Sequence, residues 1–367
     1  MQFIDLKKQY ELIKNDVLIQ INKVLDSGQY IMGEQVHKLE EELSLYTGAK
    51  YSIGVADGTK ALLLALMAID IKPQDEVIVP AFTFFASASM IALLGATPVF
   101  VDIDPKTYTV DPLSFEKAIT SKTKAVITVS LFGQVSDHAT INSIADAHNI
   151  TVIEDAAQSF GATNNHIKSC NLTKIATTSF FPSKPLGAYG DGGACFTADE
   201  EIAIKIKKLR IHGQDYRYHH ELLGLNARLD TIQAAILLAK LKVFDAEVKL
   251  RQEIGANYTQ KLKNANCITP YIAEVNTHVY AQYSILVNNR DEFIKNLNNN
   301  NIPTAVHYPL PLHHQPSLMQ YYDATVHQKL PYSEQISKQV VSVPMHPYLD
   351  ENTQDYIVEN VIKYAKL

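Results

Sequence analysis

Four short runs rich in β-branched residues decide the fold of this chain. They are Glu76-Val-Ile-Val79, Pro98-Val-Phe-Val101, Ala125-Val-Ile-Thr-Val-Ser130 and Thr151-Val-Ile-Glu154. Segments with the apolar spacing of helices separate the runs, at residues 86–94, 113–119 and 139–148. Continuous apolar strands that alternate with helices are typical of a mainly parallel sheet covered on both faces. The sequence therefore predicts an α/β fold.

Upstream of these runs, an apolar strand turns directly into a helix that is apolar nearly all round. The sequence is Ser52-Ile-Gly-Val-Ala-Asp-Gly-Thr-Lys-Ala-Leu-Leu-Leu-Ala-Leu66. A helix of this composition is buried, and its first turn presents free N–H groups at Gly58, Thr59 and Lys60. Together with the helix dipole, these groups attract a phosphate. A plain strand-to-helix turn is the alternative interpretation.

Downstream of the runs, one lysine is surrounded by prolines and glycines. Lys184 lies in Thr178-Ser-Phe-Phe-Pro-Ser-Lys-Pro-Leu-Gly-Ala-Tyr-Gly-Asp-Gly-Gly193. The run 175–181 predicts a buried strand, which Pro182 and Pro185 end on an irregular turn. A desolvated lysine favours its neutral, nucleophilic form, so we expect Lys184 to hold a cofactor as a Schiff base. A surface lysine in a Pro/Gly loop is the alternative.

A carboxylate is expected at the same edge of the sheet. Asp155 directly follows the strand at 151–154, and functional residues of such sheets gather at the carboxyl ends of the strands. A cap of a following helix is the alternative role for Asp155. No G-x-G-x-x-G follows the first strand, so a dinucleotide site is not predicted. The run His212-Gly-Gln-Asp-Tyr-Arg-Tyr-His-His220 lacks a ligand set at metal spacing, and no metal site is predicted.

Composition restricts the partners and the compartment. The 367 residues are 46% hydrophobic, enough for a large core and too many for one ordinary domain. A net charge of -6 does not favour nucleic acid or an anionic membrane as a partner. The three cysteines, Cys170, Cys195 and Cys267, lie far apart, which indicates a reducing compartment. With no apolar leader or spanning run, we expect a cytoplasmic protein.

Five motifs together resemble the DegT/DnrJ/EryC1/StrS sugar aminotransferases, a family of pyridoxal-phosphate enzymes of fold type I. They are Gly58-Thr59, Phe82-Thr-Phe84, Glu154-Asp-Ala-Ala-Gln158, Ser179-Phe-Phe-Pro-Ser-Lys184 and Gly224-Leu-Asn-Ala-Arg228. The resemblance covers essentially the whole chain. It implies a large cofactor-binding domain with a sheet of the seven-stranded type at 1–245 and a smaller α+β domain at 246–367. Strands near 280–287 and 341–343 and a helix at 291–299 fit the smaller domain.

The resemblance implies a role for each matching residue. Lys184 would form the Schiff base and move the substrate proton, while Asp155 would pair with the pyridine nitrogen. The other cofactor contacts would be Gly58, Thr59 and Ser179 at the phosphate, Gln158 on the phenolic oxygen side, Phe84 stacked on the ring, and Asn226 at the phosphate of the neighbouring subunit's cofactor. The active sites would then be shared across a homodimer.

Within the family, the chain is similar to bacterial enzymes that aminate C3 of UDP-2-acetamido-2-deoxy-3-keto-glucuronic acid. The similarity lies in Ser169-Cys-Asn171, the run 212–220 and Pro303-Thr-Ala-Val-His-Tyr-Pro309. We therefore expect Arg228, His307 and Tyr308 to hold the glucuronate carboxylate. An intersubunit salt bridge of Arg228, with His307 only packing, is the alternative.

The implied reaction moves an amino group from L-glutamate to the keto-sugar, with pyridoxamine 5′-phosphate as the cofactor's intermediate form. Its product would be a diamino uronic acid for a bacterial surface polysaccharide such as lipopolysaccharide O-antigen. One alternative is another nucleotide-linked 3- or 4-ketosugar, on dTDP, UDP or GDP. A non-catalytic, cofactor-binding regulatory protein of the same fold is a further alternative.

Overall fold

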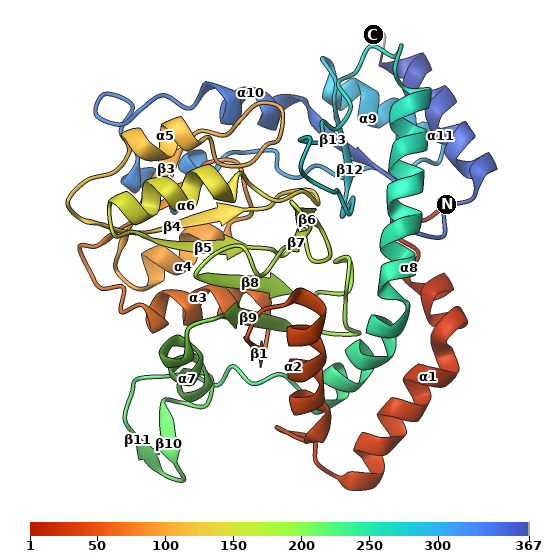
Figure 1. The fold of residues 1–367 in the computed structure, drawn as a ribbon. Coiled ribbons are helices and arrows are strands. Elements are labelled where there is room, and N and C mark those ends of the chain that lie inside the picture. Colours follow the sequence, from red (N-terminus) through yellow and green to blue (C-terminus); the bar gives the residue numbers. More distant parts are fainter. Residues whose placement is uncertain (366–367) are drawn as a thin grey trace.

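A seven-stranded sheet lies at the centre of this computed structural model, which describes residues 1–365 (Figure 1). The strands are β1 (Tyr51–Val55), β2 (Glu76–Pro80), β3 (Thr97–Val101), β4 (Thr123–Val129), β5 (Thr151–Asp155), β8 (Ile175–Ser179) and β9 (Gly193–Thr197). Their order across the sheet is β1-β9-β8-β5-β4-β2-β3. Only β9 runs antiparallel to its neighbours, β8 and β1, among these strands. The prediction of a mainly parallel sheet is confirmed.

Helices cover both faces of the sheet (Figure 1). On one face lie α3 (Gly58–Ala68), α4 (Ala86–Leu93) and α7 (Glu200–Leu209), and on the other lie α2 (Glu34–Thr47), α5 (Pro112–Lys117) and α6 (His138–Ala147). Successive strand residues enter different cores: Val126 packs with α5 and α6, whereas Ile127 packs with α3 and α4. Because both faces are buried, the strands are apolar without interruption.

The longest helix joins the two ends of the molecule. α8 (Thr231–Lys261) lies beside α1 (Leu6–Ser27) and extends toward the chain termini (Figure 1). The helix continues through Gly255 without a break. A Cβ on Gly255 would lie 2.4 Å from Cε2 of Tyr280. The glycine therefore makes room for a packed tyrosine ring, and it does not end the helix.

The last third of the chain forms a second core. β12 (Tyr283–Leu286) and β13 (Val340–Val343) are the two strands that the sequence indicated. They pair antiparallel and pack with α9 (Arg290–Asn299) and α11 (Glu351–Tyr364). The sequence analysis did not predict α10 (Pro331–Gln339) or α11. The proposed domain boundary at 245/246 lies inside α8, so one helix would contribute to both domains. That division stays a prediction.

The remaining elements are short. They are β6 (Thr163–Asn164), β7 (Ile167–Lys168), β10 (Gln214–Tyr216), β11 (His219–His220), η1 (Leu312–His314) and η2 (Met319–Tyr321). The polar run at 212–220, expected as a loop, is a β10–β11 hairpin that projects beyond α7 (Figure 1). Within residues 1–365, the helices all lack the combination of length and hydropathy that a membrane crossing requires.

A buried ion pair anchors the edge strand β1. Arg210, at the end of α7, contacts the carboxylate of Glu40 in α2, and both side chains are buried. The same two groups satisfy the backbone of Gly54. Arg210 Nη1 donates to the Gly54 carbonyl at 2.7 Å, and the Gly54 N–H donates to Glu40 Oε1 at 2.9 Å. One ion pair thus connects two helices with the strand between them.

Removal of the cation should destabilise the fold strongly. Arg210→Met leaves the Glu40 carboxylate buried without a positive partner, so the free energy of unfolding should fall by about 3–5 kcal/mol. Lys205 lies on the same helix as Arg210 and forms an ion pair with Asp70, which is exposed. Lys205→Ala should lower the free energy of unfolding by only about 0–1 kcal/mol. Urea unfolding of both variants measures the difference. Equal losses in the two variants would contradict the anchoring role.

Candidate active site

Asp155 ends β5 at the carboxyl edge of the sheet, where two hydrogen bonds fix its carboxylate. Ala157 N–H donates to Oδ1 at 3.1 Å, and the Ser87 hydroxyl donates to Oδ2 at 3.1 Å. The residues that follow Asp155 form turns and no helix, so the alternative role as a helix cap is wrong. Only 7% of Asp155 is exposed. Its carboxylate is therefore held in one orientation by the fold.

Lys184 lies on the turn after β8, close enough to Asp155 for each charge to act on the other. The turn is closed by Lys184 N–H, which donates to the Phe181 carbonyl at 2.9 Å. Burial lowers the pKa of the Lys184 ammonium, and the Asp155 carboxylate opposes this shift. Burial raises the pKa of Asp155. The Ala157 hydrogen bond, the Lys184 cation and the Ser87 hydrogen bond each lower it, but by less. The structure thus brings together the two residues that the sequence singled out.

The start of α3 lies against the end of β8. A Cβ on Gly58 would lie 2.6 Å from Cβ of Ser179, so the backbone approaches this serine as closely as it can. Gly193, opposite Ser179 in the β8–β9 register, is equally crowded, because its Cβ would lie 2.5 Å from the carbonyl carbon of Asp57. Two glycines therefore permit the strand ends and the helix start to meet.

Fewer N–H groups are free at the start of α3 than the sequence indicated. Asp57 caps the helix, and its Oδ1 accepts the Lys60 N–H at 2.7 Å. Lys60 N–H is therefore not free, which corrects the expectation for this residue. In the described part of the chain, the N–H groups of Gly58 and Thr59 remain available at the helix start, beside the Ser179 hydroxyl. Backbone donors at a helix N-terminus suit an anion such as a phosphate.

An aromatic ring and an amide group contact Tyr308, whose hydroxyl is close enough to Asp155 to be affected by its charge. Phe84 is 52% exposed, and its ring centroid lies 5.9 Å from that of Tyr308. Gln158 Nε2 donates to the Tyr308 hydroxyl at 3.3 Å, and its Oε1 accepts the Phe132 N–H at 2.7 Å. Gln158 thus fixes Tyr308 in the wall of the site, a contact that the sequence did not suggest.

His307 shares this neighbourhood. Its Nδ1 lies 3.4 Å from the Ser342 hydroxyl, which can donate to it or accept from it. Burial and, second, the Lys184 cation lower the pKa of His307 to about 4. Burial likewise raises the pKa of the Tyr308 hydroxyl. At neutral pH both side chains are therefore uncharged, and they offer hydrogen bonds without charge to any ligand beside Lys184.

Asn226 and Arg228 lie in a different pocket of the chain. This open pocket of about 450 Å³ is also lined by Asp57 and Lys60. The Ala56 N–H donates to the Ala227 carbonyl at 2.9 Å, which holds the segment along β1. Arg228 Nε is buried and has no partner within residues 1–365. Arg228 forms a bridge with Val55 of β1, and the described chain contains no hydrogen bond from Arg228 to His307 or Tyr308.

The sequence analysis missed two residues that support the site. Ser87 orients Asp155, and Lys240 of α8 donates its Nζ to the Gly187 carbonyl in the lysine turn. Burial lowers the pKa of Lys240 to about 8. Ser87 carried a readable signal, because it is a polar residue in the otherwise apolar start of α4. The Lys240 contact joins residues 53 positions apart, which no local pattern indicates.

Comparisons with known proteins identify relatives over the whole length. A model of the DegT/DnrJ/EryC1/StrS aminotransferase family matches residues 11–362. The UDP-2-acetamido-2-deoxy-3-oxo-D-glucuronate aminotransferase of Pseudomonas aeruginosa is 52% identical over 95% of this chain and 96% of its own. A pleiotropic regulatory protein of Geobacillus stearothermophilus is 44% identical over 99% and 98%. The crystal structure of DesV from S. venezuelae, in complex with a ketimine intermediate, has 35% identity and a TM-score of 0.96, covering 100% of this chain and 98% of its own.

Acid should destabilise the fold partly through His307. Its pKa of about 4 in the folded chain lies below the ordinary 6.5, so the unfolded chain binds the proton first as the pH falls. The contribution of neutral His307 is complete above pH 6.5 and is lost between about 6.5 and about 4. At about 1.4 kcal/mol for each pH unit, the loss approaches about 3 kcal/mol.

Urea unfolding at several pH values between neutral and acidic checks this expectation. His307→Asn should show a shallower fall of unfolding free energy with acid than the parent chain. His166→Asn, which changes an exposed histidine, is the control and should keep the parent slope. An unchanged slope in His307→Asn would show that His307 titrates normally in the folded chain.

Proposed function

The chain belongs to the DegT/DnrJ/EryC1/StrS aminotransferase family, and on this basis we propose a substrate and a role for each site residue. The protein is a pyridoxal-phosphate-dependent aminotransferase of nucleotide-linked keto-sugars. It moves an amino group from L-glutamate to C3 of UDP-2-acetamido-2-deoxy-3-keto-glucuronic acid. The 52% identity with the Pseudomonas aeruginosa enzyme over 350 residues supports this substrate.

One observation carries the proposal: a partly buried lysine and a buried carboxylate lie close enough at the carboxyl edge of the sheet for each charge to act on the other. The residues around them fit pyridoxal 5′-phosphate by their chemistry. Gly58, Thr59 and Ser179 provide donors for a phosphate, and the exposed ring of Phe84 offers a stacking surface. This donor set combines an anion site, an aromatic surface, an acid and an amine, as this cofactor requires.

Each site residue would have its own role in the reaction. When bound, pyridoxal 5′-phosphate supplies an electron-accepting ring that carries the amino group from donor to acceptor. Lys184 would take up and return the substrate proton, since burial favours its neutral, basic form. Asp155, held by Ser87 and Ala157, would keep the ring nitrogen protonated. Gln158 would keep Tyr308 beside the cofactor's phenolic oxygen side.

The remaining site residues point to a second copy of the chain. Asn226 and Arg228 line a pocket of their own, and the buried Nε of Arg228 has no partner within the described chain. A buried N–H donor without a partner is costly, so a neighbouring chain or its ligands would satisfy it. In a homodimer, Asn226 would reach the phosphate of the partner's cofactor. Arg228 would meet the substrate carboxylate that His307 and Tyr308 contact from the other chain.

The cysteines fit a reducing compartment. All three are free thiols, and burial raises the pKa of Cys195 to about 12 and of Cys267 to about 11. Thiols that stay protonated do not serve as nucleophiles or form disulfides readily. This chemistry supports the cytoplasm as the place of action, where the diamino uronic acid for a surface polysaccharide such as O-antigen would be built.

A regulatory protein is the second candidate function, favoured only by the name of the Geobacillus stearothermophilus relative. Lys184 and Asp155 speak against it, because a binding protein needs no lysine of lowered pKa beside a fixed acid. Incubation of the purified protein with L-glutamate and a panel of UDP-, dTDP- and GDP-linked 3- and 4-ketosugars, read by mass spectrometry, tests both proposals. We expect amination at C3 of the UDP-linked keto-glucuronate. No product from any sugar would favour the regulatory role.

Replacement of the acid tests its charge. Asp155→Asn should retain the cofactor yet lose turnover by about 10²–10⁴-fold, because an amide cannot stabilise a protonated ring nitrogen. Asp155→Glu should be less harmful. Asp137→Asn, at the cap of α6 away from the site, is the control and should keep full turnover. Steady-state kinetics decide between the outcomes: parent-like turnover in Asp155→Asn would remove Asp155 from the mechanism.

Replacement of the arginine tests the substrate carboxylate. Arg228→Ala should weaken the keto-sugar half-reaction by about 1.5–3 kcal/mol, the contribution of a charged hydrogen bond, and change the glutamate half-reaction little. Arg228→Lys should restore only part of the loss, since lysine lacks the planar fork. Stopped-flow spectra separate the two half-reactions. Equal slowing of both would show that Arg228 does not read the sugar.

A further inference from the structure

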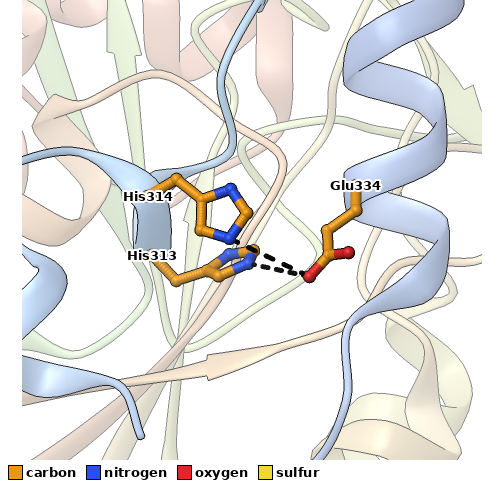
Figure 2. Close-up of side chains that lie close together, drawn as sticks. All are labelled: His313, His314 and Glu334. Atoms are coloured by element: carbon orange, nitrogen blue, oxygen red, sulfur yellow. Dashed lines mark hydrogen bonds and ion pairs between the residues drawn. The ribbon is translucent and has the colours of Figure 1, made fainter. Parts of the chain in front are cut away.

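Two histidines and a glutamate converge at a place remote from the lysine turn in the sequence. His313 and His314 belong to η1, and Glu334 lies in α10 (Figure 2). His313 Nε2 lies 3.4 Å from Glu334 Oε1, and His314 Nε2 lies 3.9 Å from the same oxygen. All three ligand atoms lie within 4.8 Å of one another. Consecutive residues seldom aim at one point, yet these two rings do.

The spacing suits a metal ion better than direct hydrogen bonds. Bonds of 2.0–2.1 Å to a tetrahedral ion place neighbouring ligand atoms roughly 3.3 Å apart. A charged hydrogen bond between imidazole and carboxylate is shorter, at about 2.7–2.9 Å. The observed separations of 3.4 and 3.9 Å therefore leave room for an ion between the groups. A small contraction of the three side chains would complete the ligand geometry.

The ligand set selects the class of ion. Two imidazole nitrogens and one carboxylate oxygen suit Zn²⁺ and similar late divalent metals, whereas Mg²⁺ and Ca²⁺ prefer oxygen ligands alone. The side chains of His314 and Glu334 are 45% and 41% exposed, so water can fill the fourth position.

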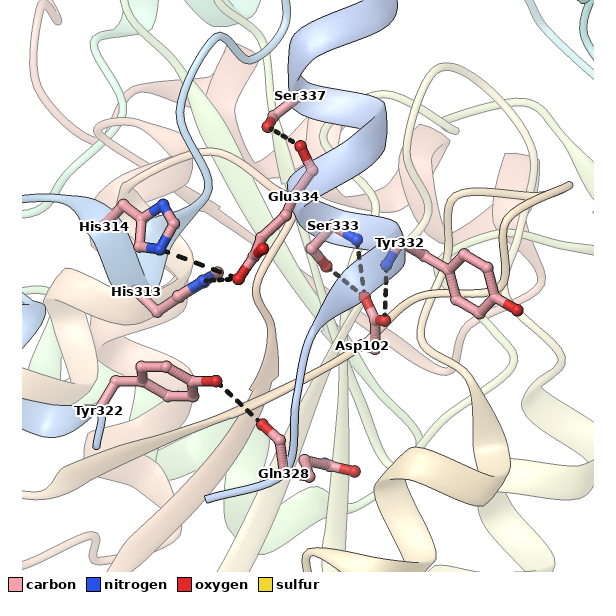
Figure 3. Close-up of polar contacts among 9 residues, drawn as sticks. All are labelled: Asp102, His313, His314, Tyr322, Gln328, Tyr332, Ser333, Glu334 and Ser337. Carbon is pink, nitrogen blue, oxygen red and sulfur yellow. Dashed lines mark hydrogen bonds and ion pairs between the residues drawn. The ribbon is translucent and has the colours of Figure 1, made fainter. Parts of the chain in front are cut away.

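Neighbouring groups hold the ligands in place (Figure 3). Asp102 accepts the N–H groups of Tyr332 and Ser333 at 2.9 and 2.8 Å, and the Ser333 hydroxyl at 2.6 Å. These bonds fix the first turn of α10 just before Glu334. The Tyr322 ring packs 4.7 Å from the His313 ring, centroid to centroid. The fully buried His313 side chain is thus oriented by packing.

We propose that His313 Nε2, His314 Nε2 and Glu334 Oε1 bind one Zn²⁺ ion that clamps η1 to α10. The clamp supports the segment that carries His307 and Tyr308. That segment leads into η1, while α10 leads into β13, whose Ser342 contacts His307. The ion has a structural role, and its binding does not depend on the proposed substrate. The sequence analysis considered metal only at 212–220 and did not connect residues 313 and 334.

Zn²⁺ binding to the purified, cofactor-loaded protein tests the clamp. After removal of metal with a chelator, titration calorimetry with Zn²⁺ should show one ion per chain, and thermal unfolding should move to higher temperature with the ion. His314→Ala and Glu334→Gln should each weaken the affinity by about tenfold or more. Both side chains are half exposed, so the variants should fold, which circular dichroism and cofactor absorbance can verify.

His37→Ala is the matched control. His37 Nδ1 lies 3.9 Å from Glu40 Oε2, an ordinary histidine–carboxylate pair without a third ligand, and its loss should leave Zn²⁺ binding unchanged. Co²⁺ in place of Zn²⁺ should give the visible absorption of a four-coordinate site in the parent chain and in His37→Ala only. Absence of Zn²⁺ binding by the parent chain would overturn the proposal. Parent-like affinity in His314→Ala or Glu334→Gln would overturn it equally.

Discussion

The proposed chemistry of this protein depends on the electrostatic interaction between Lys184 and Asp155. Burial makes each charge unfavourable alone, lowering the pKa of the lysine and raising that of the acid, and each group partly offsets the shift of the other. Such a pair persists only where the surrounding fold fixes both members. Here the end of β5, the Ser87 hydroxyl and a proline-bounded turn provide that support.

The sheet supplies the site by bringing distant segments to one edge. Parallel strands present their carboxyl ends together, so Asp155 and Lys184 meet although 29 positions separate them in the numbering of the chain. Gly58 and Gly193 permit a closer approach than any other residue would, and they leave backbone donors beside Ser179. Packing therefore sets the position of every group, and the chemistry follows from burial.

Much of the fold could be predicted because its strands are apolar throughout and its motifs are local. The runs at 76–79 and 151–154 became β2 and β5, and Asp155 and Lys184 came together as their strand ends require. Contacts between distant residues could not be predicted. The Tyr280 ring packs on Gly255 inside α8, and the partners of Gln158 and Glu334 lie on other segments. The bridge between Arg228 and Val55 of β1 likewise joins residues far apart in the sequence.

Borohydride reduction of the cofactor-loaded protein tests the central claim most directly. Reduction fixes a lysine–cofactor link permanently, and peptide mass spectrometry then locates the modified residue. The account predicts one pyridoxyl group, on Lys184, and none in Lys184→Ala. Lys240 is the internal comparison, since it is also buried with a lowered pKa of about 8 but faces the Gly187 carbonyl. A label on Lys240, or none on Lys184, would contradict the assignment of Lys184 as the cofactor-binding residue.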